Sequence, residues 1–294
     1  MHQASKSKSN SYSPIIIQNN FRFRFNLHKG WTTTIFILNL AFADMLYCIV
    51  NLPFYAMTYL KYGWFWGSFL CKASTGIRYI TAFADWMSLG MVAVSRCLCL
   101  TKPDLSHKIF SGMNGKLVII SIWIYANLLV APMYFQKTLQ MGTFGYNCKI
   151  GKCDFVPTEE SQAYPRVVLY IVGFSVPCLM TSISYAIIWG YIWKTNQYLR
   201  NNGNLSLKNA IAKREQKTTW TLFIICFCYF LFVLPIALVN VIDEELQNPI
   251  LHLGLHCLYW LQYSLNFFIY AARSEQYRKA YAFFLKKVRL FAYL

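Results

Sequence analysis

Six long apolar segments constrain this chain more than any other feature of its sequence. They lie near residues 33–60, 72–100, 115–135, 165–193, 218–242 and 250–271. Each is long enough to cross a bilayer, which takes roughly 20 residues of helix. Only 13% of the 294 residues are charged, whereas a soluble domain has about 25%. Because backbone groups in lipid must be hydrogen-bonded internally, these segments predict an all-α membrane protein.

The basic residues indicate which way the segments cross the membrane. A formal net charge of +17 would also suit a nucleic-acid-binding protein. However, 21 of the 28 Lys and Arg residues fall in the two termini and in the connections after the second and fourth segments. Membrane proteins concentrate Lys and Arg in cytoplasmic loops. We therefore predict a multi-pass plasma-membrane protein with both termini cytoplasmic and with no nucleic-acid partner.

The same pattern divides the chain into three parts. Residues 1–30 are polar and basic, lack a span and are expected to form a cytoplasmic tail, and residues 31–272 form the transmembrane bundle. Residues 273–294 alternate basic and aromatic residues at helical spacing, which predicts an amphipathic helix on the membrane surface. No arrangement of catalytic side chains is evident, so we do not expect an enzyme.

Three of the ten cysteines flank apolar segments. Cys71 lies twenty-five residues before Arg96, so one helix would place them roughly 37 Å apart, at opposite membrane surfaces. Cys148 and Cys153 fall in the outer connection after the third segment. A disulfide from Cys71 to one of these two is expected in an oxidising compartment. We favour Cys153, which leaves Cys148 as a spare thiol.

Several short motifs occur in a specific order along residues 30–290. They are "LNLAFADML" with Asp44, "SRC" at residues 95–97, Trp123, Pro177 and Tyr185, Pro235, and "NFFIY" at residues 266–270. In order and spacing the chain resembles the rhodopsin-like (class A) G-protein-coupled receptors, and its tail resembles that of an arthropod branch of the family. The resemblance implies a rhodopsin-like bundle that responds to an extracellular ligand and activates a heterotrimeric G protein.

The chain departs from the family in number of spans and at three positions. The family has seven spans, and the apolar run of the first is missing, so we expect six of seven spans plus the amphipathic helix. Ser95, Val233 and Phe267 stand where the family has an acid, a tryptophan and a proline. Two alternatives stay open, a non-signalling receptor fragment and a six-span channel or transporter.

By resemblance, the switch residues are Arg96, Tyr185, Glu215, Pro235 and Tyr270. The family implies that Arg96 holds the inactive state and then contacts the G protein. Glu215 stands at the position of its acidic partner, at the cytoplasmic start of the same helix as Pro235. The alternative is an arginine that reaches water from a helix end without any such role.

Two acids lie inside apolar segments, where an unpaired carboxylate is costly. Asp44 and Asp85 are expected to lie near Asn266, and the family places a hydrated sodium ion at this position. The alternative is that one carboxyl is protonated, because two neighbouring carboxylates raise one pKa.

Arg78 lies two helical turns from Cys71. A buried guanidinium favours a carboxylate or phosphate partner, so we predict an anionic, lipid-like ligand at Arg78, with walls formed by Trp86, His256, Trp260 and Tyr263. The alternative is an internal salt bridge from Arg78 to Asp154 or to the acids at residues 243–245.

Overall fold

The computed structural model describes residues 14–134, 143–156, 164–201, 206–243, 247–273 and 275–292. Within these ranges, the side chains of several helix ends, including residues 14–33 and 206–215, are not described.

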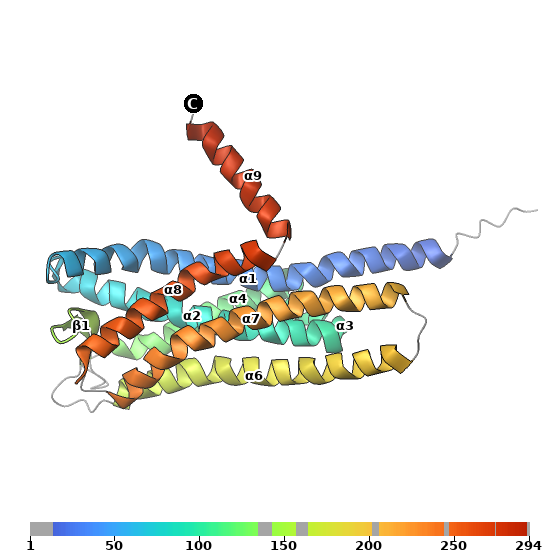
Figure 1. Cartoon of the computed structure of the whole chain (residues 1–294). Coiled ribbons are helices and arrows are strands. Elements are labelled where there is room, and N and C mark those ends of the chain that lie inside the picture. Colours follow the sequence, from blue (N-terminus) through green and yellow to red (C-terminus); the bar gives the residue numbers. More distant parts are fainter. Residues whose placement is uncertain are drawn as a thin grey trace, which may run out of the picture.

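In the described part of the chain, six long helices form an elongated bundle (Figure 1). They are α1 (Pro14–Leu60), α2 (Gly67–Thr101), α4 (Gly112–Val130), α6 (Tyr164–Asn201), α7 (Ser206–Ile242) and α8 (Pro249–Arg273). Between them lie the short helices α3 (Pro103–Phe110) and η1 (Ala131–Met133) and the strands β1 (Thr143–Asn147) and β2 (Lys152–Val156). The last helix, α9 (Glu275–Ala292), leaves the bundle at a steep angle (Figure 1).

Helix α2 is the centre of the bundle and packs against α1, α4 and α6. Within its most apolar stretch 72% of residues are buried, compared with 22–39% in the other four candidate spans. A helix surrounded by other helices has no lipid-facing side, so polar residues on it meet protein rather than lipid. This placement explains why α2 carries Arg78, Asp85 and Arg96, all of them buried.

Within the described residues, five helices are long and apolar enough to span a membrane, in α1, α2, α4 with η1, α6 and α7. The sixth expected span corresponds to α8, which forms a helix over the expected residues but does not meet this criterion. Polar residues interrupt its apolar sequence, and four of them, His252, His256, Gln262 and Asn266, are buried inside the bundle.

Helix α1 begins earlier than the sequence indicated. The first apolar segment was expected from residue 33, after a tail of thirty residues, but the helix already starts at Pro14. Its first turns extend beyond the other helices (Figure 1). Residues 1–13 lie outside the described part of the chain.

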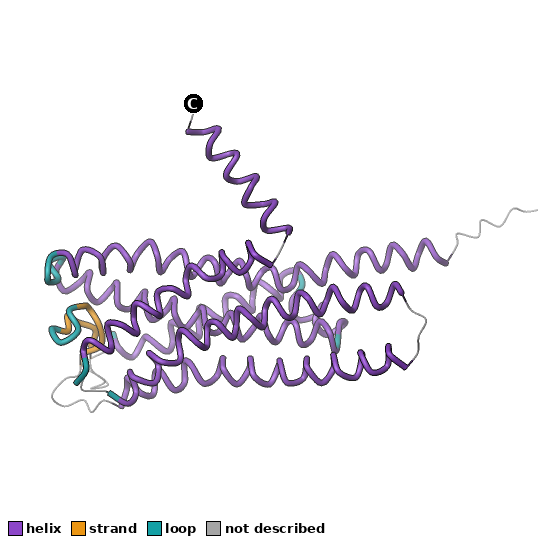
Figure 2. The backbone as a smooth tube through the Cα atoms, in the orientation of Figure 1, coloured by secondary structure: helices purple, strands orange, loops and turns teal. Residues whose placement is uncertain are grey.

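A two-stranded hairpin closes one end of the bundle (Figure 2). Strands β1 and β2 are antiparallel, with Tyr146 opposite Cys153 and Gly145 opposite Asp154. The connecting turn contains Gly151 at a positive φ of 61°, a conformation that glycine adopts at little cost. A disulfide joins Cys153 to Cys71 at the start of α2, and Cys148 is an exposed free thiol. The preferred cysteine pairing is therefore the one that the structure forms.

Candidate functional site

The hairpin carries an acid into the bundle, where it meets Arg78. Arg78 Nη2 donates to Asp154 Oδ1 at 2.7 Å, and Nη1 lies 3.4 Å from Oδ2. The Tyr79 hydroxyl donates to Asp154 Oδ1 at 2.9 Å, and Lys152 Nζ lies 3.2 Å from Oδ2. One carboxylate thus accepts from three side chains, two of them cationic. The salt bridge to Asp154, one of the alternatives weighed for Arg78, is present.

Lys152 extends this cluster to helix α8. It is only 2% exposed and contacts His256 Nε2. His256 Nδ1 lies 2.7 Å from the carbonyl oxygen of His252, so Nδ1 carries the proton and Nε2 accepts from the lysine ammonium. The Tyr55 ring lies 5.9 Å from both cationic groups. We call Arg78, Asp154, Lys152 and His256 the outer cluster.

Local geometry explains how the outer cluster forms. Alternate residues of a strand share a face, so Lys152 and Asp154 point together while Cys153 points away to its disulfide with Cys71. Phe144 on β1 is 2% exposed and stacks on Tyr79 with ring centroids 5.5 Å apart. The disulfide and this stack hold the hairpin against α2.

The predicted ligand-binding residues do not surround one large cavity. Arg78, Trp86 and His256 line a cavity of about 40 Å³, far below the 300–1,000 Å³ typical of ligand sites. Trp260 instead donates to the Tyr47 hydroxyl at 3.0 Å, and Tyr263 stacks on Tyr47 at 4.0 Å between centroids. The structure therefore holds this end of the bundle closed.

A second polar cluster lies deeper in the bundle. Asp44 on α1 accepts from Asn266 Nδ2 on α8 at 2.8 Å and from the Tyr229 hydroxyl on α7 at 3.2 Å. Asn266 also donates to Tyr229 at 3.1 Å. The structure thus brings Asp44 and Asn266 together, as expected, and adds Tyr229, which the sequence had not indicated.

Asp85 differs from Asp44 in its hydrogen bonding. Its exposed fraction is zero, and it interacts electrostatically with Asp44. Among the described residues, neither of its carboxylate oxygens has a hydrogen-bond partner, nor does Asn266 Oδ1. Two arrangements are compatible with this geometry. A cation can bind the three buried oxygens, or a proton on Asp85 can remove its charge. We call Asp44, Asp85, Asn266 and Tyr229 the inner cluster.

The predicted switch residues are only partly described. Arg96 and Ser95 are buried, and the Ser95 hydroxyl donates to the Val92 carbonyl at 2.9 Å. The Tyr185 hydroxyl lies 3.8 Å from Cys226 Sγ, and Pro235 lies inside α7. The side chains of Glu215 and Tyr270 lie outside the described residues, so the pairing of Arg96 with Glu215 stays a prediction.

Comparison with known proteins identifies the family. The family model described as 7 transmembrane receptor (rhodopsin family) matches residues 21–280. The chain belongs to this receptor family. The fold agrees, because squid rhodopsin superposes with a TM-score of 0.75 at 21% identity, over 87% of this chain and 76% of that one.

Two insect relatives are similar over most of this rhodopsin-family receptor. Protein trapped in endoderm-1 of Drosophila melanogaster is 25% identical over 85% of this chain and 67% of its own length. The receptor moody of the same species is 23% identical, and the match spans only 45% of its length. Human galanin receptor type 1 is 25% identical over 85% of this chain. The expected resemblance to arthropod receptors of this family is thus confirmed, over 84–85% of the chain.

Sequence reasoning missed several members of the two clusters in this receptor. Lys152 has the clearest signal, since it precedes Cys153 and so must lie near Cys71 once the disulfide forms. Tyr229 of the inner cluster, and Tyr55 beside the outer cluster, come from helices distant in the sequence. Tyrosines are too common here, at 21 of 294 residues, to be singled out individually.

Proposed function

We propose that this receptor transmits the binding of an anionic, lipid-like ligand to a heterotrimeric G protein at the plasma membrane. The observation that carries the proposal is the alignment of charges along α2. Arg78, Asp85 and Arg96 are separated by seven and eleven residues, which at 3.6 residues per turn places all three within about 20° of one face. They span about 27 Å, most of the bilayer core.

This face connects three layers of polar contacts. The outer cluster surrounds Arg78, the inner cluster surrounds Asp85, and Arg96 stands at the end that the charge pattern makes cytoplasmic. A ligand that alters the contacts of Arg78 would favour one arrangement of α2 relative to α7 and α8, and so shift an existing equilibrium. Arg96 and the basic connection between α6 and α7 would then meet the G protein.

The charge of the outer cluster supports an anionic ligand. Arg78 and Lys152 both pair with Asp154, so the outer cluster itself contains two cations and one acid when His256 is neutral. An incoming carboxylate or phosphate can bind these cations or compete with Asp154 for the guanidinium. Because the present cavity is about 40 Å³, binding requires the hairpin to move away from α8.

The inner cluster fits a hydrated sodium ion. Asp44, Asp85 and Asn266 would hold it, since their buried oxygens include three without a hydrogen-bond partner in the described structure. A bound cation would neutralise the repulsion between the two carboxylates and stabilise the arrangement in which α1, α2 and α8 are close together.

The proposal is tested by expressing the full chain with an N-terminal tag and measuring G-protein dissociation with anionic lipids as probes. We expect a concentration-dependent response that Arg78→Gln weakens by at least about tenfold in potency, the effect of one charge-assisted hydrogen bond. Lys149→Gln removes a charge from the exposed turn of the same hairpin and should leave potency unchanged.

Two outcomes would contradict the proposal. Surface-expressed protein that gives no G-protein response to any probe would favour the non-signalling fragment. Labelling of the N-terminal tag on intact cells would contradict the cytoplasmic N-terminus.

A further inference from the structure

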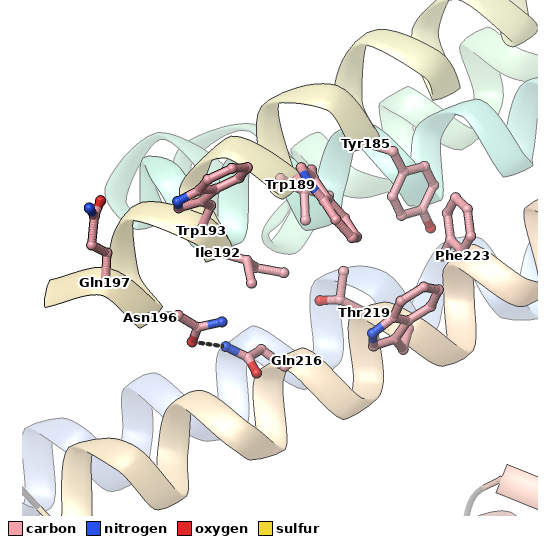
Figure 3. Close-up of a pocket in the computed structure, with 11 residues that line it drawn as sticks. Tyr185, Trp189, Ile192, Trp193, Asn196, Gln197, Gln216, Thr219 and Phe223 are labelled. Carbon is pink, nitrogen blue, oxygen red and sulfur yellow. Dashed lines mark hydrogen bonds between the residues drawn. The ribbon is translucent and has the colours of Figure 1, made fainter. Parts of the chain in front are cut away.

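A cavity of ligand size in the described structure lies far from both polar clusters. It has a volume of about 660 Å³ and is formed between α6 and α7, at the same end of the bundle as Arg96. Figure 3 shows Trp189, Ile192 and Trp193 on one helix facing Gln216, Thr219 and Phe223 on the other. Its volume falls within the 300–1,000 Å³ range of small-molecule sites.

The cavity is polar at one end and apolar at the other. At its cytoplasmic end, Gln216 Nε2 donates to Asn196 Oδ1 at 2.8 Å across the two helices, and Gln197 stands beside them. At its inner end, Tyr185 packs edge-on against Phe223 with centroids 5.2 Å apart. An occupant would thus place its polar group toward the cytoplasm and its apolar body toward the bilayer centre.

The length of the cavity matches one leaflet. Tyr185 and Asn196 are eleven residues apart on α6, which corresponds to about 16 Å along a helix. The hydrocarbon core of a bilayer is about 30 Å thick, so the cavity extends from the cytoplasmic surface to about the midplane. Its walls are accessible, since Trp189, Trp193 and Trp220 are 62%, 66% and 48% exposed.

The lining determines the chemical class of the occupant. Its polar groups are the side-chain amides of Asn196, Gln197 and Gln216, the hydroxyls of Thr219 and Tyr185, and the indole N–H groups of the three tryptophans. None of the eleven lining residues carries a full charge. A phospholipid phosphate would require Arg or Lys at this position. Amides hydrogen-bond well to a hydroxyl, which both donates and accepts. Flat indole faces provide large rigid contact surfaces for a rigid ring system.

We propose that the cavity between α6 and α7 binds a sterol of the inner leaflet, with its hydroxyl on Asn196 and Gln216 and its rings between Trp189, Trp193 and Trp220. The same residues join the two helices. Gln216 and Asn196 are hydrogen-bonded, and Trp189 packs edge-on against Trp220 with ring centroids 6.4 Å apart. A bound sterol therefore holds the cytoplasmic ends of α6 and α7 at a fixed separation.

The test uses the full chain in phosphatidylcholine nanodiscs with a photoreactive sterol as the probe. We expect labelling to saturate, to map to residues 185–197 and 216–223, and to be competed by unlabelled sterol. The double variant Asn196→Leu/Gln216→Leu should lower labelling about fivefold, the effect of losing one hydrogen bond of ordinary strength.

The matched control is Ile183→Ala, which changes a 58% exposed residue of α6 outside the cavity and should leave labelling unchanged. Labelling that does not saturate, or that is spread over all lipid-facing helices, overturns the proposal. So does competition by phosphatidylserine or a phosphoinositide in place of the sterol. Mapping and competition are measured on the unaltered protein and decide whether the sterol site exists. Loss of expression in the double variant therefore leaves the test valid.

Discussion

Asp154 is one acid that pairs with two cations, Arg78 and Lys152, inside a membrane-embedded bundle. Its loss should therefore destabilise the outer cluster more than the loss of either cation. Its side chain is 12% exposed and that of Arg78 is 9% exposed. Removing one partner of a buried pair costs about 3–5 kcal/mol because the other charge is left uncompensated. Removing Asp154 leaves two such charges, whereas removing Arg78 leaves Asp154 paired with Lys152.

We therefore predict that Asp154→Leu lowers the free energy of unfolding by about 3–5 kcal/mol, and that Arg78→Leu lowers it by less. The double variant should be more stable than Asp154→Leu alone. Thermal unfolding of the detergent-purified chain measures all three changes, and a double-mutant cycle isolates the pair. Equal costs for the two single variants would contradict the predicted difference between Asp154 and Arg78. Additive costs in the double variant would show that the pair contributes little.

The inner cluster gives a second prediction at the residue scale. If Asp44 and Asp85 bind sodium, the folded chain becomes more stable as the sodium concentration rises above the dissociation constant. We predict that the melting temperature is higher in sodium chloride than in choline chloride, and that Asp44→Asn abolishes the difference. Asp104→Asn removes an exposed acid, and this variant should still melt at a higher temperature in sodium chloride than in choline chloride. A salt effect that persists in Asp44→Asn would refute the sodium site.

The sequence predicts the residues of the outer cluster only in part, for a geometric reason. Asp154 is next to Cys153, and Arg78 lies two turns from Cys71. The expected disulfide therefore brings Asp154 within reach of Arg78. It does not exclude the acids at residues 243–245, because nothing local fixes the end of α7. Asp243 in fact caps the start of α8, where it accepts from the backbone N–H of Gln247 at 2.8 Å, and this contact lowers its pKa.

At the scale of elements, close approach of backbones limits substitution where α3 turns into α4. A Cβ added to Gly115 would lie 2.6 Å from the Phe110 carbonyl oxygen, and a backbone atom cannot move aside without shifting α3. Phe110 is itself fixed, since it is 2% exposed and packs edge-on against Phe36 of α1.

We predict that Gly115→Ala destabilises the chain by about 1–3 kcal/mol, the usual cost of overpacking. Gly190→Ala is the matched control, because its Cβ would meet nothing within 4 Å and alanine favours a helix by up to about 1 kcal/mol over glycine. Melting temperatures of the two variants should move in opposite directions. A neutral or stabilising Gly115→Ala would mean that α3 shifts at little cost.

Hydropathy predicts the helices of this chain better than it predicts their ends. The apolar segments coincide with helices, because lipid and protein interiors both exclude polar residues. The start of α1 at Pro14 was missed because "PIIIQNNFRFRF" is not apolar enough for a span, although it contains no internal proline or glycine to end a helix. The polar residues of α8 lower its hydropathy, but they are buried inside the bundle and so face other helices rather than lipid.

At the scale of the whole molecule, α2 connects the two ends of the bundle, and the end that carries Arg96 has an unusual sequence. Ser95 stands beside Arg96 where the family has an acid, and the Ser95 hydroxyl is hydrogen-bonded to its own helix. A serine supplies no negative charge to Arg96. We therefore expect the restraint between α2 and α7 to depend on Glu215, at the start of α7, more than it would in a relative with an acid at position 95.

We predict that Glu215→Ala raises basal signalling, because losing the pair frees α7 to separate from α2. An ion pair near a membrane surface contributes up to about 1 kcal/mol, so the equilibrium should shift toward the active arrangement by about fivefold. Basal G-protein dissociation, normalised to surface expression, measures the change. Asp104→Asn alters another acid at the same end of the bundle and should leave basal signalling unchanged. Unchanged signalling in Glu215→Ala at equal expression would instead make Arg96 an arginine that only reaches water at the helix end.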